Sequence, residues 1–298
     1  MAYWRWGDGQ ARHVVVCVHG LTRQGRDFDR LAQALVAQST RPLQVICPDV
    51  VGRGQSDWLG HAAHYQLPQY AADMLAMLTQ VAGQICAPLS AFTEPPSGGT
   101  AAALTLDWVG TSMGGLVGLI LAGQPGLPLP APIRRLVLND VGPAIRWESV
   151  QRMQSYVGHF GEFANLDQAA EALRLVSQGF GPVPAPVWRE MTVHMTRALA
   201  GGALTLHYDP AIALPLRALT PEAAAVGEVS LWTLYDQIQA SSLLIRGAES
   251  DLLTAQTAHE MTQRGPRAQL QTWPGVGHAP TLTEDGQIAR VASFVLGA

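Results

Sequence analysis

The chain is poor in charged residues, and it has no run of basic ones. Only 14% of its 298 residues are charged, and the formal net charge is -4. Because neutralising nucleic-acid phosphates needs clustered Lys and Arg, no nucleic-acid partner is expected. Hydrophobic residues make up 48% of the chain, which favours a compact globule over a disordered segment.

Long apolar runs are missing as well. The stretch after Ser112 comes nearest, but its glycines and the later "GQPG" interrupt it, so no membrane span is expected. The first residues, "MAYWRWGDG", lack the apolar centre of a signal peptide. Cys17, Cys47 and Cys86 are odd in number and lack metal-ligand spacing, which indicates a reducing compartment. We therefore expect a cytoplasmic protein, and the oligomeric state stays open.

Motifs for nucleotides and metals are absent from the sequence. It contains no G-x-G-x-x-G, no glycine-rich run that ends in Gly-Lys-Ser/Thr, and no H-E-x-x-H. These absences count against a nucleotide-phosphate cradle and a zinc-peptidase site. We expect no cofactor and no metal.

Short apolar segments alternate with helical patterns along most of the chain. This alternation predicts an α/β fold with a mostly parallel sheet covered by helices on both faces. We interpret the first residues as a hairpin, in which the turn Gly7-Asp8-Gly9 joins the aromatic strand "YWRW" to Val14–Val18. The other expected strands are "LQVICPDV", Leu104–Val109, Ile133–Leu138, "SSLLIRG" and "AQLQTW".

The alternation stops after Asn139-Asp140. Residues 143–230 read as helical segments with proline-rich breaks and no convincing strand. The sequence therefore predicts a core domain, residues 1–142 and 231–298, interrupted by a helical insertion.

The stretch "WVGTSMGGL" contains the pattern G-x-S-x-G around Ser112. An apolar strand precedes this serine and a helix follows, so the chain must turn sharply at Ser112, with glycines that leave room for the backbone. A helix N-terminus would also point free N–H groups at the site. We expect Ser112 to be a nucleophile; the alternative is an ordinary helix N-cap.

A catalytic serine needs a base, and the base needs an orienting carboxylate. His278 is the candidate base, because it stands on a Gly/Pro-rich loop after the strand that ends at Trp273. Asp251, on the loop after "LLIRG", is the preferred acid. Asp140, which also ends a strand, is the competitor.

Two backbone donors are expected for a developing oxyanion. The turn after His19-Gly20 could aim the Leu21 N–H at it, and the Met113 N–H would be the second donor. The nearby stretch Asp49–Ser56 is interpreted as structural, because its glycines permit tight turns beside the site.

Together these stretches resemble the α/β-hydrolase superfamily. The resemblance covers the whole chain, through "HGLTR", "DVVGRGQSD", "GTSMGG", "GAESD" and "GVGHAP" in that order. It implies a three-layer fold with an eight-stranded sheet, in which residues 143–230 form a lid after the sixth strand. By position it implies the triad Ser112, Asp251 and His278. Serine at position 112 excludes the aspartyl-nucleophile chemistry of dehalogenases and epoxide hydrolases.

The resemblance implies acyl transfer on a small, fairly apolar ester. Lid aromatics could shape the pocket or simply form the lid's own core; the tentative pocket residues are His19, Tyr156, Trp188 and Tyr208. Three alternatives stay open: a carbon–carbon bond hydrolase, a cofactor-free perhydrolase and, of another class, a non-catalytic ligand receptor.

Overall fold

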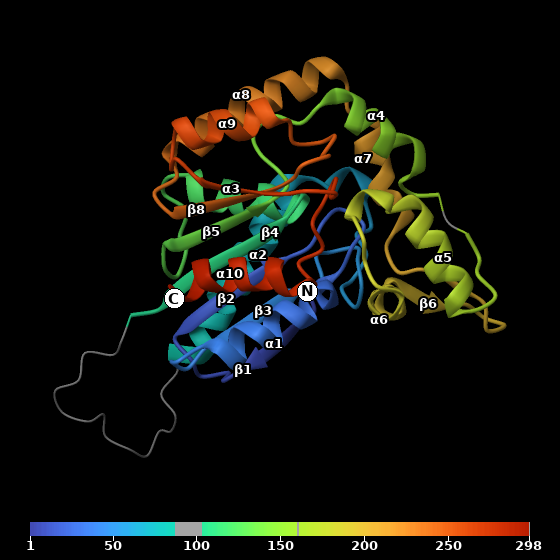
Figure 1. Cartoon of the computed structure of the whole chain (residues 1–298), viewed down its shortest axis with the longest axis horizontal. Coiled ribbons are helices and arrows are strands. Elements are labelled where there is room, and N and C mark those ends of the chain that lie inside the picture. Colours follow the sequence, from blue (N-terminus) through green and yellow to red (C-terminus); the bar gives the residue numbers. More distant parts are fainter. Residues whose placement is uncertain (87–102, 160, 298) are drawn as a thin grey trace.

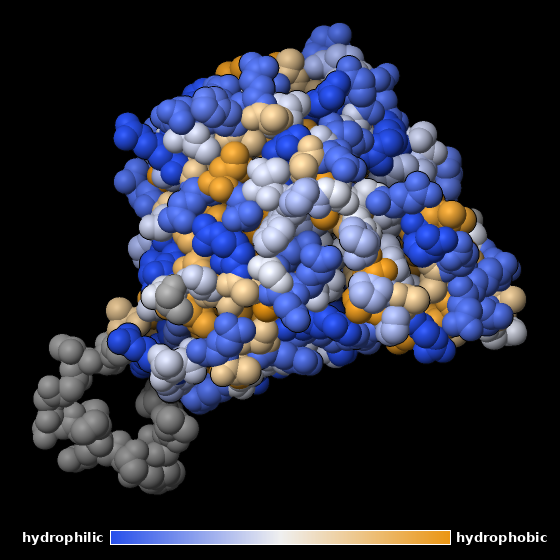
Figure 2. Space-filling view, in the orientation of Figure 1, coloured by the Kyte–Doolittle hydropathy of each residue, from blue (hydrophilic) through white to orange (hydrophobic). Residues whose placement is uncertain are grey.

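The computed structural model describes residues 1–86, 103–159 and 161–297 (Figure 1). The sequence "APLSAFTEPPSGGT", residues 87–100, is rich in Pro, Gly and Ser and predicts a loop, and it lies outside these ranges. Within them, no helix is both long enough and apolar enough to cross a bilayer. Apolar side chains are dispersed among polar ones on the face shown in Figure 2.

A twisted sheet of seven strands forms the centre of the described structure. All its neighbouring pairs are parallel except that of β1 with β3. The mostly parallel α/β sheet is thus confirmed, with seven strands in place of the expected eight. In sheet order the strands are β1 (Tyr3–Gly7), β3 (Gln44–Pro48), β2 (His13–Val18), β4 (Thr105–Thr111), β5 (Ile133–Asn139), β8 (Ser241–Gly247) and β9 (Gln269–Trp273).

The expected N-terminal hairpin is wrong. Strand β1 does not pair with β2, which follows it, but lies antiparallel to β3, with Trp4 opposite Cys47. Both edges of β2 are already occupied by parallel neighbours, β3 and β4. The outer edge of β3 is therefore where the aromatic strand finds backbone partners.

Two cores lie on opposite faces of the sheet, because successive strand residues point to opposite sides. In β2, Val14 and Val16 pack on one face, while Val15 and Cys17 pack on the other. The first face is covered by α2 (Leu67–Cys86), α3 (Met113–Gly123), α8 (Pro221–Gln237) and α9 (Ala255–Gln263). The second is covered by α1 (Asp29–Gln38) and α10 (Asp285–Leu296), which gives three layers (Figure 1).

The chain between β5 and β8 leaves the sheet and builds a separate group of short elements beside it (Figure 1). Contrary to expectation this group contains two strands, which pair antiparallel as a small sheet. Its elements are α4 (Trp147–Tyr156), α5 (Leu166–Val176), η3 (Gln178–Phe180), α6 (Ala185–Met195), β6 (Thr196–Ala198), β7 (Leu204–Leu206), η4 (Pro210–Ile212) and α7 (Ala213–Ala218). The remaining short helices are η1 (Gly25–Phe28) and η2 (Ala62–His64).

The C-terminal boundary expected at residue 230 falls inside α8. This helix runs without a break to Gln237 and packs against α3, where the Leu234 backbone faces Gly123. Helix α8 therefore belongs to the helical layer of the core. We use "inserted segment" below for residues 143–218, from the end of the β5 loop to the end of α7.

The inserted segment is tied to the core between its two ends. The Gly54 N–H donates to the His207 carbonyl (3.0 Å), and the Asp209 N–H donates to the Gly52 carbonyl (2.7 Å). These bonds pair the loop after β3 with the stretch after β7. Two exposed ion pairs, Arg30–Glu190 and Arg152–Asp251, also cross between core and inserted segment.

Candidate active site

Ser112 stands on the sharp turn between β4 and α3. Its backbone has φ 51° and ψ -118°, in a region that non-glycine residues rarely adopt. A Cβ on Gly110 would lie 2.3 Å from the Gly114 carbonyl oxygen, and one on Gly114 would lie 2.1 Å from that of Val18. Both glycines are therefore required for the turn. The Ser112 side chain makes no capping bond to α3, contrary to the N-cap alternative.

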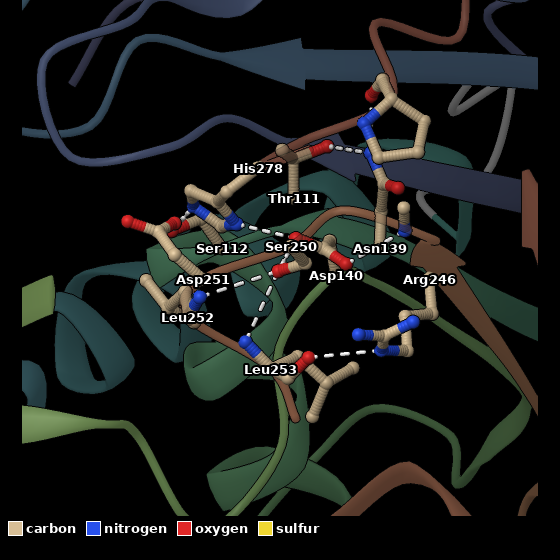
Figure 3. A network of polar contacts seen from close by, with 12 residues as sticks. Thr111, Ser112, Asn139, Asp140, Arg246, Ser250, Asp251, Leu252, Leu253 and His278 are labelled. Carbon is tan, nitrogen blue, oxygen red and sulfur yellow. Dashed lines mark hydrogen bonds and ion pairs between the residues drawn. The ribbon is translucent and has the colours of Figure 1, made fainter. Parts of the chain in front are cut away.

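His278 lies on the loop between β9 and α10, and its two ring nitrogens face two different partners (Figure 3). Its Nε2 is 3.0 Å from Ser112 Oγ, and its Nδ1 is 2.7 Å from Asp140 Oδ2. A carboxylate only accepts, so Nδ1 carries the proton and Nε2 has a free lone pair toward the serine. This orientation suits a general base.

The expectation that Asp251 accepts the Nδ1–H of His278 is wrong, and Asp140 takes that place. Asp251 instead pairs with Arg152 at 2.8 Å, where both side chains are nearly half exposed. Asp140 follows β5 directly, at φ 56°, and is completely buried. Because β5 neighbours β4, a residue at its end comes close to the serine turn, whereas Asp251 stands four residues beyond the end of β8.

Three donors hold the Asp140 carboxylate. Besides His278, the Gly247 N–H donates to Oδ1 (2.9 Å) and the Ser250 hydroxyl donates to Oδ2 (2.6 Å). The Ser250 oxygen in turn accepts the N–H groups of Leu252 and Leu253 (Figure 3). The loop after β8 therefore takes part in the site through Ser250, not through Asp251.

Asn139 links the end of β4 to the loop that carries His278, and it was not among the residues predicted from the sequence. Its Nδ2 donates to Thr111 Oγ1 (3.0 Å) and to the Pro280 carbonyl (2.8 Å). Its own carbonyl accepts the Ser112 N–H (3.0 Å). Asn139 is fully buried, so these bonds act without competing water. The available signal was an amide residue directly after the apolar run Leu136–Leu138.

The turn after β2 lies against Ser112. A Cβ on Gly20 would be 3.6 Å from the Cβ of Ser112. The buried His19 side chain fixes this turn through two hydrogen bonds. Its Nδ1 donates to the Gly20 carbonyl (2.7 Å), and its Nε2 accepts the Val50 N–H (2.9 Å). Burial is the main cause that lowers the pKa of His19 to about 3, so its imidazole is neutral.

His19 makes stability depend on pH in a defined direction. Its folded pKa lies below the ordinary 6.5, so between these values the unfolded chain binds one more proton. The free energy of unfolding therefore decreases as pH falls below 6.5, by about 1.4 kcal/mol per pH unit from this group. In urea unfolding from pH 7 to pH 4.5, we expect His19→Gln to lose stability less steeply than wild type. Parallel curves for the two proteins would contradict this assignment.

A cavity of about 560 Å³ opens over Ser112 and His278. Of the tentative pocket residues, His19, Tyr156 and Tyr208 line it, and Trp188 does not. Trp188 instead stacks against the ring of Phe180, with centroids 5.9 Å apart and planes 5° apart. Of the two rings, only Phe180 lines the cavity. Trp188 is buried in the small hydrophobic core of the inserted segment, and Phe180 packs against that core.

The described ranges contain no cluster of three or more His, Cys, Asp or Glu side chains that could hold a metal ion. Cys17 and Cys47 are buried within the sheet, and Cys86 is exposed; all three are free thiols.

Comparison with known proteins identifies the family to which the chain belongs. The chain is 40% identical to a 3-hydroxybutyrate-oligomer hydrolase of Cupriavidus necator, over 100% of this chain and 93% of that protein. An alpha/beta hydrolase from Novosphingobium aromaticivorans has 32% identity and a TM-score of 0.79, over 98% of this chain and 92% of that one. A hydrolase structure described as putative, from Rickettsia typhi, has 25% identity and the same TM-score, over 99% and 90%.

Residues 15–291 match the sequence profile of the alpha/beta hydrolase family, nearly the whole described chain. The strained serine, the strand order and the site at the carboxyl ends of the strands agree with that match. The superfamily resemblance inferred from the sequence is confirmed: this chain belongs to the alpha/beta hydrolase family.

Proposed function

We propose that this protein hydrolyses carboxylic ester bonds through an acyl-enzyme on Ser112, with His278 as base and Asp140 as its orienting acid. The observation that carries the proposal is the continuous hydrogen-bonded chain from Asp140 through His278 to Ser112, which ends at the floor of a cavity. Nucleophile, base and orienter within hydrogen-bond reach are the arrangement that activates a serine hydroxyl.

In the first half-reaction, Ser112 Oγ attacks the ester carbonyl carbon while His278 Nε2 takes the hydroxyl proton. The N–H groups of Leu21 and Met113 stabilise the negative oxygen, and His278 then gives its proton to the departing alcohol. In the second half-reaction, His278 removes a proton from water, which attacks the acyl carbon. The carboxylic acid leaves, and the proton returns to Ser112.

The inserted segment is proposed to act as a lid. It supplies much of the cavity wall, through residues such as Tyr156, Phe163, Phe180, Met195 and Tyr208. The two ion pairs to the core, Arg30–Glu190 and Arg152–Asp251, are exposed and therefore weak, which suits a segment that must admit substrate. Helix α8 is left out of this lid.

The substrate class proposed is a short oligomer of a hydroxy acid. Oligomers of 3-hydroxybutyrate, named in the Cupriavidus necator relative, are chains joined by ester bonds. A cavity of about 560 Å³ with aromatic and Met side chains among polar ones suits a small, fairly apolar chain of this kind.

The test uses purified protein with the linear dimer and trimer of 3-hydroxybutyrate, p-nitrophenyl butyrate and a vinylogous 1,5-diketone, and measures products by chromatography. We expect the oligomers to be cleaved to monomer with the highest kcat/KM, and the diketone to be left intact. Cleavage of the diketone alone would favour the carbon–carbon hydrolase. Peracid formation from acetate and peroxide without ester turnover would favour the perhydrolase, and tight binding without turnover the receptor.

A further inference from the structure

Arg53 is a fully buried arginine in the loop between β3 and α2, within the stretch Asp49–Ser56 that the sequence marked only as structural. Burial is the largest effect on the pKa of its guanidinium and lowers it. Tyr70, Tyr65 and the Asp209 carboxylate offset this lowering only in part. The charge lies 4.8 Å from the ring centroid of Tyr70 and 5.7 Å from that of Tyr65. Burying a charge costs free energy, so a role for the buried guanidinium has to be sought in its contacts.

The guanidinium of Arg53 reaches both segments that carry the expected oxyanion donors. Its Nε donates to the Leu21 carbonyl at 2.8 Å, and one terminal nitrogen lies 3.5 Å from Met113 Sδ. The other terminal nitrogen donates to the Val51 carbonyl at 2.7 Å. One rigid planar group thus contacts the turn after β2 and the first residue of α3.

These contacts restrict where the backbone N–H groups can point. In a trans peptide the carbonyl and the following N–H point in opposite directions. His19 holds the Gly20 carbonyl, so the Leu21 N–H must point away from His19. Arg53 holds the next carbonyl, that of Leu21, so two successive peptide planes of the turn are fixed by buried side chains.

The main chain of Arg53 is itself held on both sides. The Gly52 carbonyl and the Gly54 N–H are bonded to Asp209 and His207, and Arg53 pairs with Tyr208 as an isolated bridge. The Arg53 side chain therefore extends from a fixed stretch of backbone, which makes it suited to positioning other groups.

Resting on the proposed ester hydrolysis, we propose that Arg53 is a positioning residue that holds the Leu21 and Met113 segments at the separation that the two oxyanion donors require. Its effect is on the transition state, because the donors bind the oxygen most strongly once it is negative. Loss of Arg53 should accordingly lower kcat and leave KM nearly unchanged.

The experiment compares Arg53→Met and Arg53→Lys with wild type on p-nitrophenyl butyrate. The matched control is Arg135→Met, because Arg135 also bonds a backbone carbonyl, that of Val295, near the opposite end of β5 from Asp140. We expect kcat to fall about 10- to 100-fold in Arg53→Met, somewhat less than for loss of a whole donor, with KM within about twofold. Arg53→Lys should recover part of the loss, and Arg135→Met should keep wild-type kcat.

Unchanged kcat in folded Arg53→Met, or a rise in KM alone, would overturn this inference while ester hydrolysis by wild type still stood. An equal loss of kcat in Arg135→Met would also overturn it, because the effect would then be general to the loss of an arginine–carbonyl hydrogen bond. If wild type has no Ser112-dependent esterase activity, the proposed function fails and this inference fails with it. If Arg53→Met does not fold, Arg53→Lys and Arg53→Gln decide: reduced kcat at constant KM supports the inference, and equal kcat overturns it.

Discussion

Asp140→Asn is expected to lower kcat on an ester by about 10⁴-fold. The Asp140 carboxylate accepts the Nδ1–H of His278 and keeps the Nε2 lone pair facing Ser112. An amide at this position can donate its own hydrogen to Nδ1, which would leave the proton on Nε2, where it blocks the serine. It also removes the charge that stabilises the imidazolium. Steady-state kinetics on p-nitrophenyl butyrate measure the change.

Asp251→Asn is the matched control for Asp140→Asn. Asp251 also lies after a strand and carries a carboxylate, but its side chain pairs with Arg152 at the surface, with 47% of it exposed. Breaking such a pair costs about 0–1 kcal/mol of stability, so turnover should stay within about twofold of wild type. If Asp251→Asn abolished turnover and Asp140→Asn did not, the proposed triad would be wrong.

Ser112→Ala is expected to lower kcat by about 10⁶-fold, because the proposed acyl-enzyme forms on the Ser112 hydroxyl. A fluorophosphonate probe gives an independent readout: it should add one adduct mass to wild type and none to Ser112→Ala. The strained turn is set by the glycines around it, so the variant should fold normally. Circular dichroism and the thermal midpoint check this.

Ser155→Ala is the control serine variant for the probe. Ser155 is exposed on α4, and its hydroxyl bonds only locally, to the Arg152 carbonyl. It should keep full labelling and turnover. An adduct that survives Ser112→Ala would place the nucleophile elsewhere and contradict the proposed mechanism.

The parts of the site that follow from local pattern could be predicted from the sequence. Ser112 was identifiable because strand, glycines and helix are all encoded within a dozen residues. His278 was identifiable from a Gly/Pro-rich loop between a strand and a helix. In both cases the chain neighbours of the residue determine where its side chain lies.

The acid could not be chosen in this way, because Asp140 and Asp251 both follow apolar strands. What separates them is sheet order: β5 lies beside β4, and Asp140 turns inward at φ 56° directly after it. Which aspartate lies beside His278 therefore depends on how distant strands pair. The same holds for β1: its sequence suggested a hairpin with β2, but β1 pairs with the free edge of β3. Hydrophobic periodicity specifies a strand but not its neighbour.

The backbone pairing of residues 52–54 with residues 207–209 has a consequence for modular engineering of this chain. An exchange of the inserted segment between relatives would ordinarily be cut at its two ends, near residues 143 and 218. Such a graft would separate residues 207–209 from the native residues 52–54 with which they pair. It would also leave behind Arg53, which contacts Leu21 and Met113 beside Ser112. The smallest transplantable unit is therefore discontinuous, and it includes the Asp49–Ser56 loop.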